Sequence, residues 1–283
     1  MATSVEAQGN GEHLGMKTAR LGISRVSSSA SLLGAVAAWI IILGPSIVLL
    51  FRISPREIST QFSLPGAFGP LVTSLEASTA SLALIVAIGT PLAYRLAKGR
   101  LRFGRFLEAG LLASLVMPPL VIGLLLVFLL GPLTPIGSAL SHIGLSATNT
   151  FFALVVAEIY EAAPYYVLGA QSAFATVGNQ LEQDAQILGD RPLAVWKRVT
   201  LPLAAPGLSM ALAVAWARAI GAFGAVLIIA YHPYGLAMQV WTTLEQSGLR
   251  AALPFALLLV VVALPLPLLA YGWSARARAR FHS

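Results

Sequence analysis

Three ionisable side chains interrupt the long apolar runs of this sequence. Glu158 and Glu161 are three residues apart, which places both carboxylates on one face of a helix. Arg218 lies in the next apolar run, and Arg218 and Glu161 are each about 20 Å from the inner end of their runs at 1.5 Å per residue. Charges at membrane depth are costly and are usually paired or face a pathway. We therefore expect Arg218 to pair with Glu161 or Glu158, either as a structural ion pair or on a route for an anion.

Small residues and prolines mark further places in these runs. Gly221 and Gly224, three residues apart, allow close helix contact, at a pathway or at an interface between two copies. Proline removes a backbone hydrogen bond and bends helices. Pro118, Pro119 and Pro164 are therefore expected to shape their helices or to act as hinges.

Residue sets typical of catalysis and cofactor binding are missing from the sequence. It has no GxxxxGK[ST] phosphate loop, no HExxH and no GxSxG. It has no cysteine, and its four histidines are scattered over the termini and loops. We expect no metal site, no cofactor and no enzymatic activity in this chain, so any ATP hydrolysis belongs to a separate chain.

The composition is that of a membrane protein. Hydrophobic residues make up 57% of the 283 residues and charged residues only 10%, against about 25% charged in soluble domains. The net charge of +7 does not indicate nucleic-acid binding, because the basic residues are few and sorted by side. A membrane-spanning helix needs about 20 apolar residues. The stretches that qualify are Ala30–Phe51, Leu71–Tyr94, Phe106–Leu130, Thr150–Phe174, Leu203–Ala230 and Ala251–Trp273.

The basic residues determine the expected orientation. With the N-terminus inside, fourteen of the eighteen Lys and Arg residues lie in cytoplasmic segments, three lie outside, and Arg218 lies within a span. We expect an all-α integral membrane protein with six transmembrane helices and both termini in the cytoplasm. Residues 1–29 are expected to be a disordered tail, 30–52 a retained first helix rather than a cleaved signal, 70–274 a core of five helices, and 275–283 a basic tail.

One amphipathic segment, residues 177–202, separates the fourth and fifth spans on the cytoplasmic side. Asn179 is expected to cap a helix, Gly189 to end it in a left-handed turn, and Asp190 to cap a second short helix with Pro192 in its first turn. Pro202 is expected to stop that helix.

The second short helix carries an apolar set on one side, Leu193, Trp196 and Val199. Such a helix can lie on the inner membrane surface or dock into a groove of a cytosolic partner, and physics alone leaves both open.

This segment resembles the cytoplasmic loop signature of ABC-transporter permease subunits. The signature reads Glu-Ala-Ala, three residues, Gly, nine residues, an aliphatic residue, one residue, Leu-Pro. Gly189, Val199, Leu201 and Pro202 fit it, whereas Gln183, Asp184 and Ala185 replace the Glu-Ala-Ala triplet and retain only its last residue. The resemblance implies a coupling helix that seats in a groove of an ATPase subunit. The residues implied in coupling are Gln183, Asp184, Ala185, Gly189, Pro192, Trp196, Leu201 and Pro202.

Other stretches resemble the importers of tetrahedral oxyanions: molybdate, tungstate and sulfate. They are TPLAYRLAKGR (90–100), SLVMPPLVIGLLLVFLLGPLTPIG (114–137), ARAIGAFGAVLIIA (217–230) and LEQSGLRAA (244–252), with Ala222 where that branch usually has Glu. The resemblance implies the permease subunit of an ATP-driven importer, with molybdate as the first choice of substrate and tungstate or sulfate as possible ones.

The implied partners are a cytosolic ATP-binding subunit, an extracytoplasmic substrate-binding protein, a second copy of this chain and the lipid of the inner (plasma) membrane, with no nucleic acid. An ion-gradient-driven secondary transporter of a small anion is the alternative function. Many such transporters carry internal repeats, and none is found in this sequence.

Overall fold

The computed structural model describes residues 31–280. The chain divides into two compact units, and the boundary between them lies after residue 54. The expected tail 1–29 lies outside the described residues. In the first unit, one helix runs from Ser31 to Arg52 and is long and apolar enough to cross a membrane. It coincides with the expected first span.

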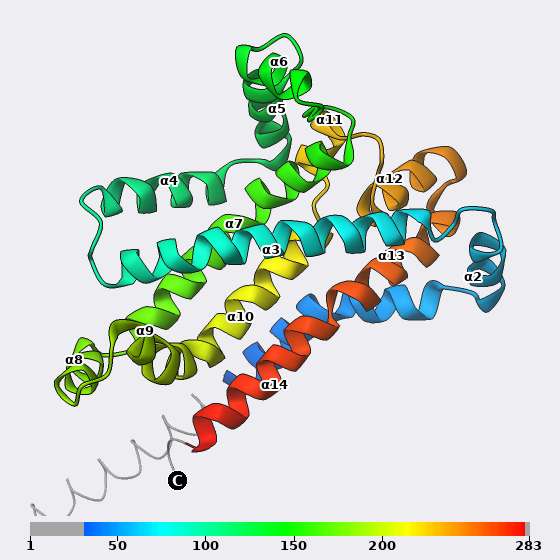
Figure 1. Ribbon diagram of the computed structural model, residues 1–283. Helices are drawn as coiled ribbons and strands as arrows, with labels where there is room; N and C mark the ends of the chain where they lie inside the picture. Colours follow the sequence, from blue (N-terminus) through cyan, green and yellow to red (C-terminus); the bar gives the residue numbers. More distant parts are fainter. Residues whose placement is uncertain (1–30, 281–283) are drawn as a thin grey trace, which may run out of the picture. The chain divides into compact units, whose positions relative to one another are not determined.

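In the described part of the second unit, all regular elements are helices (Figure 1). They are α2 (Pro55–Phe62), α3 (Gly69–Ala97), α4 (Gly104–Val116), α5 (Pro119–Leu130), α6 (Pro135–His142), α7 (Phe151–Ala175), α8 (Asn179–Ile187), α9 (Pro192–Val195), the π turn η1 (Trp196–Thr200), α10 (Leu201–Ile220), α11 (Gly224–Ile229), α12 (Leu236–Ser247), α13 (Leu249–Ala263) and α14 (Pro265–Arg280). The two units together provide five helices that could cross a membrane, and a sixth if α4 and α5 count as one broken span.

The expected third span, 106–130, is not one helix. The chain turns by 119° between α4 and α5. Met117 and Pro118 are extended, with ψ angles of 132° and 134°. A residue before proline is pushed out of the helical region, and here two consecutive prolines act on two consecutive residues. The double proline therefore breaks the span, whereas Pro164 remains inside the continuous α7.

The expected fifth span is also interrupted, between α10 and α11 at residues 221–223, and it begins earlier than expected. Pro202 does not stop the preceding helix, because α9, η1 and α10 follow one another without a gap. Within an α-helix, the ring of Pro202 would clash with the carbonyl of Arg198, four residues earlier. The wider π turn lies at that place and lets the helix continue.

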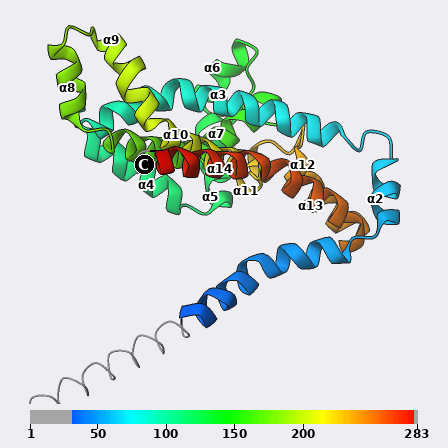
Figure 2. The same ribbon diagram turned by 90° about the horizontal axis from the view of Figure 1, so that it is seen from below.

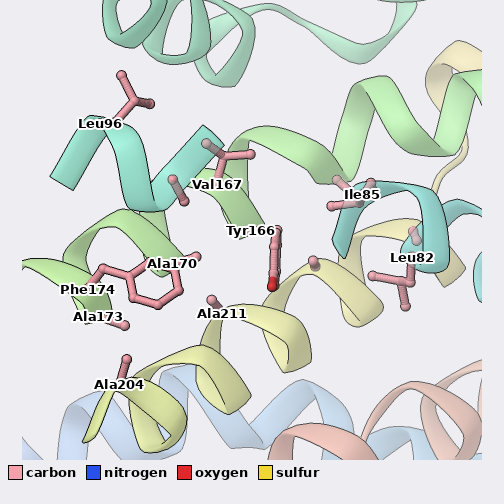
Figure 3. Close-up of a cluster of buried hydrophobic side chains, with 14 of the residues drawn as sticks. Leu82, Ile85, Leu96, Tyr166, Val167, Ala170, Ala173, Phe174, Ala204 and Ala211 are labelled. Carbon is pink, nitrogen blue, oxygen red and sulfur yellow. The ribbon is translucent and has the colours of Figure 1, made fainter. Parts of the chain in front are cut away.

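The core of the second unit lies where α7 packs between α3 and α10 (Figures 1 and 2). Its largest cluster joins Leu82 and Ile85 of α3 to Tyr166 and Phe174 of α7 and the alanines of α10 (Figure 3). The helix axes approach closely because small residues face one another. A Cβ atom on Gly169 would lie 2.8 Å from the Cβ of Ala211.

The two broken spans meet through their second halves, α5 and α11. A Cβ on Gly224 would lie 2.5 Å from the Cβ of Pro119, and a Cβ on Gly123 would lie 2.8 Å from the Cβ of Ile228. Glycine at these two positions allows α11 to pack closely against α5.

Candidate functional site

Glu161 of α7 and Arg218 of α10 form an ion pair inside the helical bundle. Arg218 Nη2 lies 2.9 Å from Glu161 Oε2, and the Glu161 side chain is buried. The backbone N–H of Ala225, in the first turn of α11, donates to Glu161 Oε1 over 3.2 Å. Glu161 thus bridges the end of α10 and the start of α11 across the break in the fifth span. Of the two expected partners for Arg218, the structure has Glu161.

Arg218 keeps hydrogen-bonding capacity beyond this pair. Its side chain is 36% exposed, and its guanidinium lies 5.3 Å from the ring centre of Tyr165. Its Nε atom is buried with no hydrogen-bond partner among the described residues. Gly221, just after Arg218, is exposed at the helix break. Gly224 instead is buried against Pro119, so the two glycines predicted together serve different contacts.

Glu158 faces a different set of polar groups, and the alternative pairing with Arg218 is wrong. Ser81 Oγ of α3 donates to Glu158 Oε2 over 2.9 Å, and Glu158 is 3% exposed. Ser78 Oγ is buried nearby in α3, with no hydrogen-bond partner in the part of the chain that the structure describes. Sequence reasoning missed these serines, although Ser74, Ser78 and Ser81 follow the i, i+4, i+7 pattern of one helix face.

The segment between the fourth and fifth spans forms two short helices joined at Gly189. Gly189 has φ +98°, which confirms the predicted left-handed turn, and Pro192 begins α9 as predicted. Gln183, Asp184 and Gly189 are exposed. Of the remaining residues implied in coupling, Pro192 and Pro202 are also exposed, and Ala185, Trp196 and Leu201 are half-buried.

The two predicted caps are wrong. The N-cap of α8 is Gly178, and the side-chain oxygen of Asn179 accepts from Lys98 Nζ over 3.0 Å. The N-cap of α9 is Arg191, because the helix begins one residue later than Asp190 would allow. Asp190 pairs with Arg198 at 3.2 Å on the exposed surface.

The tip of this segment is apolar and exposed. Ile187 and Leu188 precede Gly189 and are 83% and 87% exposed, and Leu193 of α9 is 64% exposed. Leu193 was expected to share a face with Trp196 and Val199, which are half-buried. Leu193 is therefore more exposed than the two residues with which it was expected to share a face. We call Ile187, Leu188 and Leu193 the tip patch.

The base of the same segment is held by a buried ion pair that sequence reasoning missed. Glu182 Oε1 of α8 lies 3.1 Å from Lys98 Nζ at the end of α3, and both side chains are at most 5% exposed. Thr200 Oγ1 of η1 donates to Glu182 Oε1 over 2.7 Å, and Tyr94 OH donates to Oε2 over 3.3 Å. Lys98 Nζ also donates to the carbonyl of Val177 over 2.9 Å. Glu182 therefore fixes α8 both to the end of α3 and to η1.

Similarity to known proteins is extensive. Residues 85–282 match the family described as the binding-protein-dependent transport system inner membrane component. A probable molybdenum ABC transporter permease protein of Haloferax volcanii is 39% identical over 215 residues, which cover 76% of this chain and 78% of the relative. The molybdenum transport system permease protein ModB of Mycobacterium bovis is 34% identical over 235 residues, covering 82% and 89%. A molybdate/tungstate transport system permease protein of Pyrococcus furiosus is 31% identical over 191 residues, covering 68% and 72%.

Solved structures share the fold. A chain from a bacterial alginate ABC transporter, crystallised with an alginate pentasaccharide-bound periplasmic protein, matches with a TM-score of 0.68 at 20% identity, covering 90% of this chain and 96% of that one. A chain of the MetNI methionine ABC transporter in an inward-facing form matches with a TM-score of 0.56 at 18% identity, covering 74% and 94%. The chain therefore belongs to the family of binding-protein-dependent transport system inner membrane components, and it is an all-helical protein of the inner membrane.

Proposed function

We propose that this chain is the permease subunit of an ATP-driven importer of molybdate, with tungstate as a related substrate. The observation that carries the proposal is the segment at 179–200, which is anchored at its base by Glu182 and exposes an apolar tip. Relatives named for molybdenum or tungstate transport over most of the chain support the substrate.

In this proposal a separate ATP-binding subunit docks on the tip patch. Ile187, Leu188 and Leu193 fit a helix-in-groove contact, in which exposed apolar residues fill a groove of the partner. Gln183 and Asp184 are exposed on the same helix α8 and would flank that contact. Movement of the partner would pass through Glu182 and Lys98 to α3, and through η1, Leu201 and Pro202 to α10.

The translocation path in this proposal lies between two copies of the chain and receives the anion from a substrate-binding protein. Arg218 and the exposed Gly221 would lie along it, since Arg218 is the basic residue placed at membrane depth and its Nε has no hydrogen-bond partner among the described residues. Neutral and cationic N–H donors are sufficient to pass a tetrahedral oxyanion.

Transport by the reconstituted complex tests the proposal. Proteoliposomes holding the permease and its ATP-binding subunit, with the binding protein added, are expected to accumulate molybdate only with ATP. Ile187→Glu/Leu188→Glu should abolish uptake and release the ATP-binding subunit on gel filtration, because two charges would enter an apolar groove. Leu133→Glu, at a fully exposed leucine of the α5–α6 connection, is the matched control and should retain both.

Two results would contradict the proposal. Uptake by the permease alone, driven by a proton or sodium gradient, would indicate the secondary transporter. Uptake of sulfate that excess molybdate does not inhibit would overturn the choice of substrate.

A further inference from the structure

A cavity of about 890 Å³ opens beside the base of the 179–200 segment, between the end of α3, η1 and the start of α10. Its lining includes neither Arg218 nor any residue of the tip patch. Its size is at the upper end of the range for drug-sized ligands and far exceeds what a single tetrahedral oxyanion fills.

The charged groups of the cavity lie at one end. Arg95 is in the last turn of α3 and Arg100 in the loop that follows, and both are exposed. Within the described residues, no carboxylate pairs with either arginine, and the lining contains no acidic residue. Arg100 lies 5.7 Å from the ring centre of Tyr94, and Trp196 of η1 lines the same end.

The other end of the cavity is apolar. Val86 of α3 lies nine residues before Arg95, which is about 13 Å along a helix at 1.5 Å per residue, and Leu208 of α10 lines the wall with it. The two hydroxyl groups at this depth belong to Thr90 and Tyr166, and they are 2.7 Å apart and bond to each other. Figure 3 shows Tyr166 projecting from α7 among the core side chains. Each of these hydroxyls therefore has a partner within the protein.

We propose that this cavity binds one anionic phospholipid of the inner leaflet, with the phosphate on Arg95 and Arg100 and the start of an acyl chain along Val86 and Leu208. The polarity of the cavity matches such a molecule along its length, with cations and interfacial aromatic residues at the headgroup level and apolar residues deeper in the bilayer. Because Trp196 is the first residue of η1, the lipid would contact the base of the 179–200 segment. The proposal goes beyond the proposed function and uses the expected cytoplasmic side of residues 95–105.

Native mass spectrometry of the intact permease–ATPase complex tests this directly. The complex is titrated with dioleoyl phosphatidylglycerol or with dioleoyl phosphatidylcholine, which share acyl chains and differ in charge. We expect one phosphatidylglycerol per permease chain to be retained and phosphatidylcholine to be lost. Arg95→Gln/Arg100→Gln should weaken phosphatidylglycerol binding by about tenfold or more, because each arginine near the surface contributes to anionic-lipid attraction.

Arg102→Gln/Arg105→Gln is the matched control, because these arginines are next to the cavity in sequence but do not line it. It removes the same charge and should retain the lipid. Leu208→Trp, which fills the apolar end and leaves both arginines, should also lose it, and gel filtration of each complex reports its assembly. Equal losses in the two double variants, or no preference for phosphatidylglycerol, would overturn the proposal.

Two other occupants can be distinguished. Competition by millimolar molybdate for the retained lipid would identify a free-oxyanion site instead. The chain has no native cysteine, so Ala87→Cys, at an exposed residue of the cavity, gives a unique thiol. Oxidative cross-linking of Cys-bearing copies through this position would show that a second permease covers the cavity, which would contradict the proposal.

Discussion

Glu161 joins three helices through one carboxylate, because it accepts from Arg218 at the end of α10 and from the backbone of Ala225 at the start of α11. Its neighbour Glu158, one helical turn away, bonds to a serine and pairs with no cation among the described residues. The two carboxylates thus have different roles despite similar burial. Of these two carboxylates, Glu161 alone balances a charge, so its loss would leave the Arg218 cation unpaired inside the bundle.

Glu161→Gln should therefore destabilise the complex more than Glu158→Gln. Stranding one member of a buried pair costs about 3 kcal/mol, the low end of the usual range because Arg218 is partly exposed. The measurement is thermal unfolding in detergent, where Glu161→Gln/Arg218→Gln should regain part of the loss. Equal effects of the two single Gln variants would refute the assignment of the pair.

At the base of the 179–200 segment, Glu182→Gln is expected to separate ATP hydrolysis from uptake. The glutamine leaves the tip patch free to dock, but it removes the charge that fixes α8 to Lys98. We expect ATPase activity to persist while the molybdate transported per ATP falls by about tenfold, the consequence of losing about 1.4 kcal/mol of coupling. The assay is ATP turnover and uptake in the same proteoliposomes.

Gln180→Ala, at another exposed position of α8 that is not among the residues implied in coupling, is the control and should leave this ratio unchanged. A parallel fall of ATPase activity and uptake in Glu182→Gln would instead point to lost docking.

At the scale of elements, α7 and α10 interlock through a reciprocal pair of small residues. Gly169 of α7 faces Ala211 of α10, and Gly207 of α10 faces Ala173 of α7. Each helix thus carries a small residue, three intervening residues and another small residue, the arrangement that lets membrane helices approach closely. The ion pair between Glu161 and Arg218 extends the same interface.

Gly207→Ala should destabilise the bundle by about 1–3 kcal/mol through overpacking, because its Cβ would lie 2.5 Å from the Cβ of Ala173. Gly207→Ala/Ala173→Gly should restore most of that stability, since the added methyl then has space. Gly110→Ala in α4, where a Cβ meets nothing within 4 Å, is the helical control and should not destabilise. The idea fails if the double variant unfolds as easily as Gly207→Ala.

At the scale of the whole molecule, the proposed orientation places residue 183 in the cytoplasm. It places residue 141, in α6 between the third and fourth spans, outside. Because the chain has no cysteine, Gln183→Cys and Ser141→Cys each introduce a single thiol at an exposed position. In intact cells a membrane-impermeant maleimide should label Ser141→Cys at once and Gln183→Cys only after permeabilisation. The reverse pattern would invert the topology.

The sequence alone determined the class of the protein and the main elements, because the apolar runs and the spacing from Gly189 to Pro202 are local features. Local chemistry also predicted the left-handed Gly189. The approximate position of Arg218 relative to Glu161 followed from counting residues along two helices. These inferences share one reason: each depends on residues close together in the chain or on the fixed rise of a helix.

Only the tertiary structure decided which side chains meet. It replaced the proposed caps at Asn179 and Asp190 with contacts to Lys98 and Arg198, and it chose Glu161 over Glu158 for Arg218. The caps failed because a side-chain oxygen bonds to whichever donor the fold brings nearest, and Lys98 is 81 residues from Asn179. The buried Glu182–Lys98 pair has the same origin, since the fold brings α8 to the end of α3, removes both charges from water and makes each the other's necessary partner.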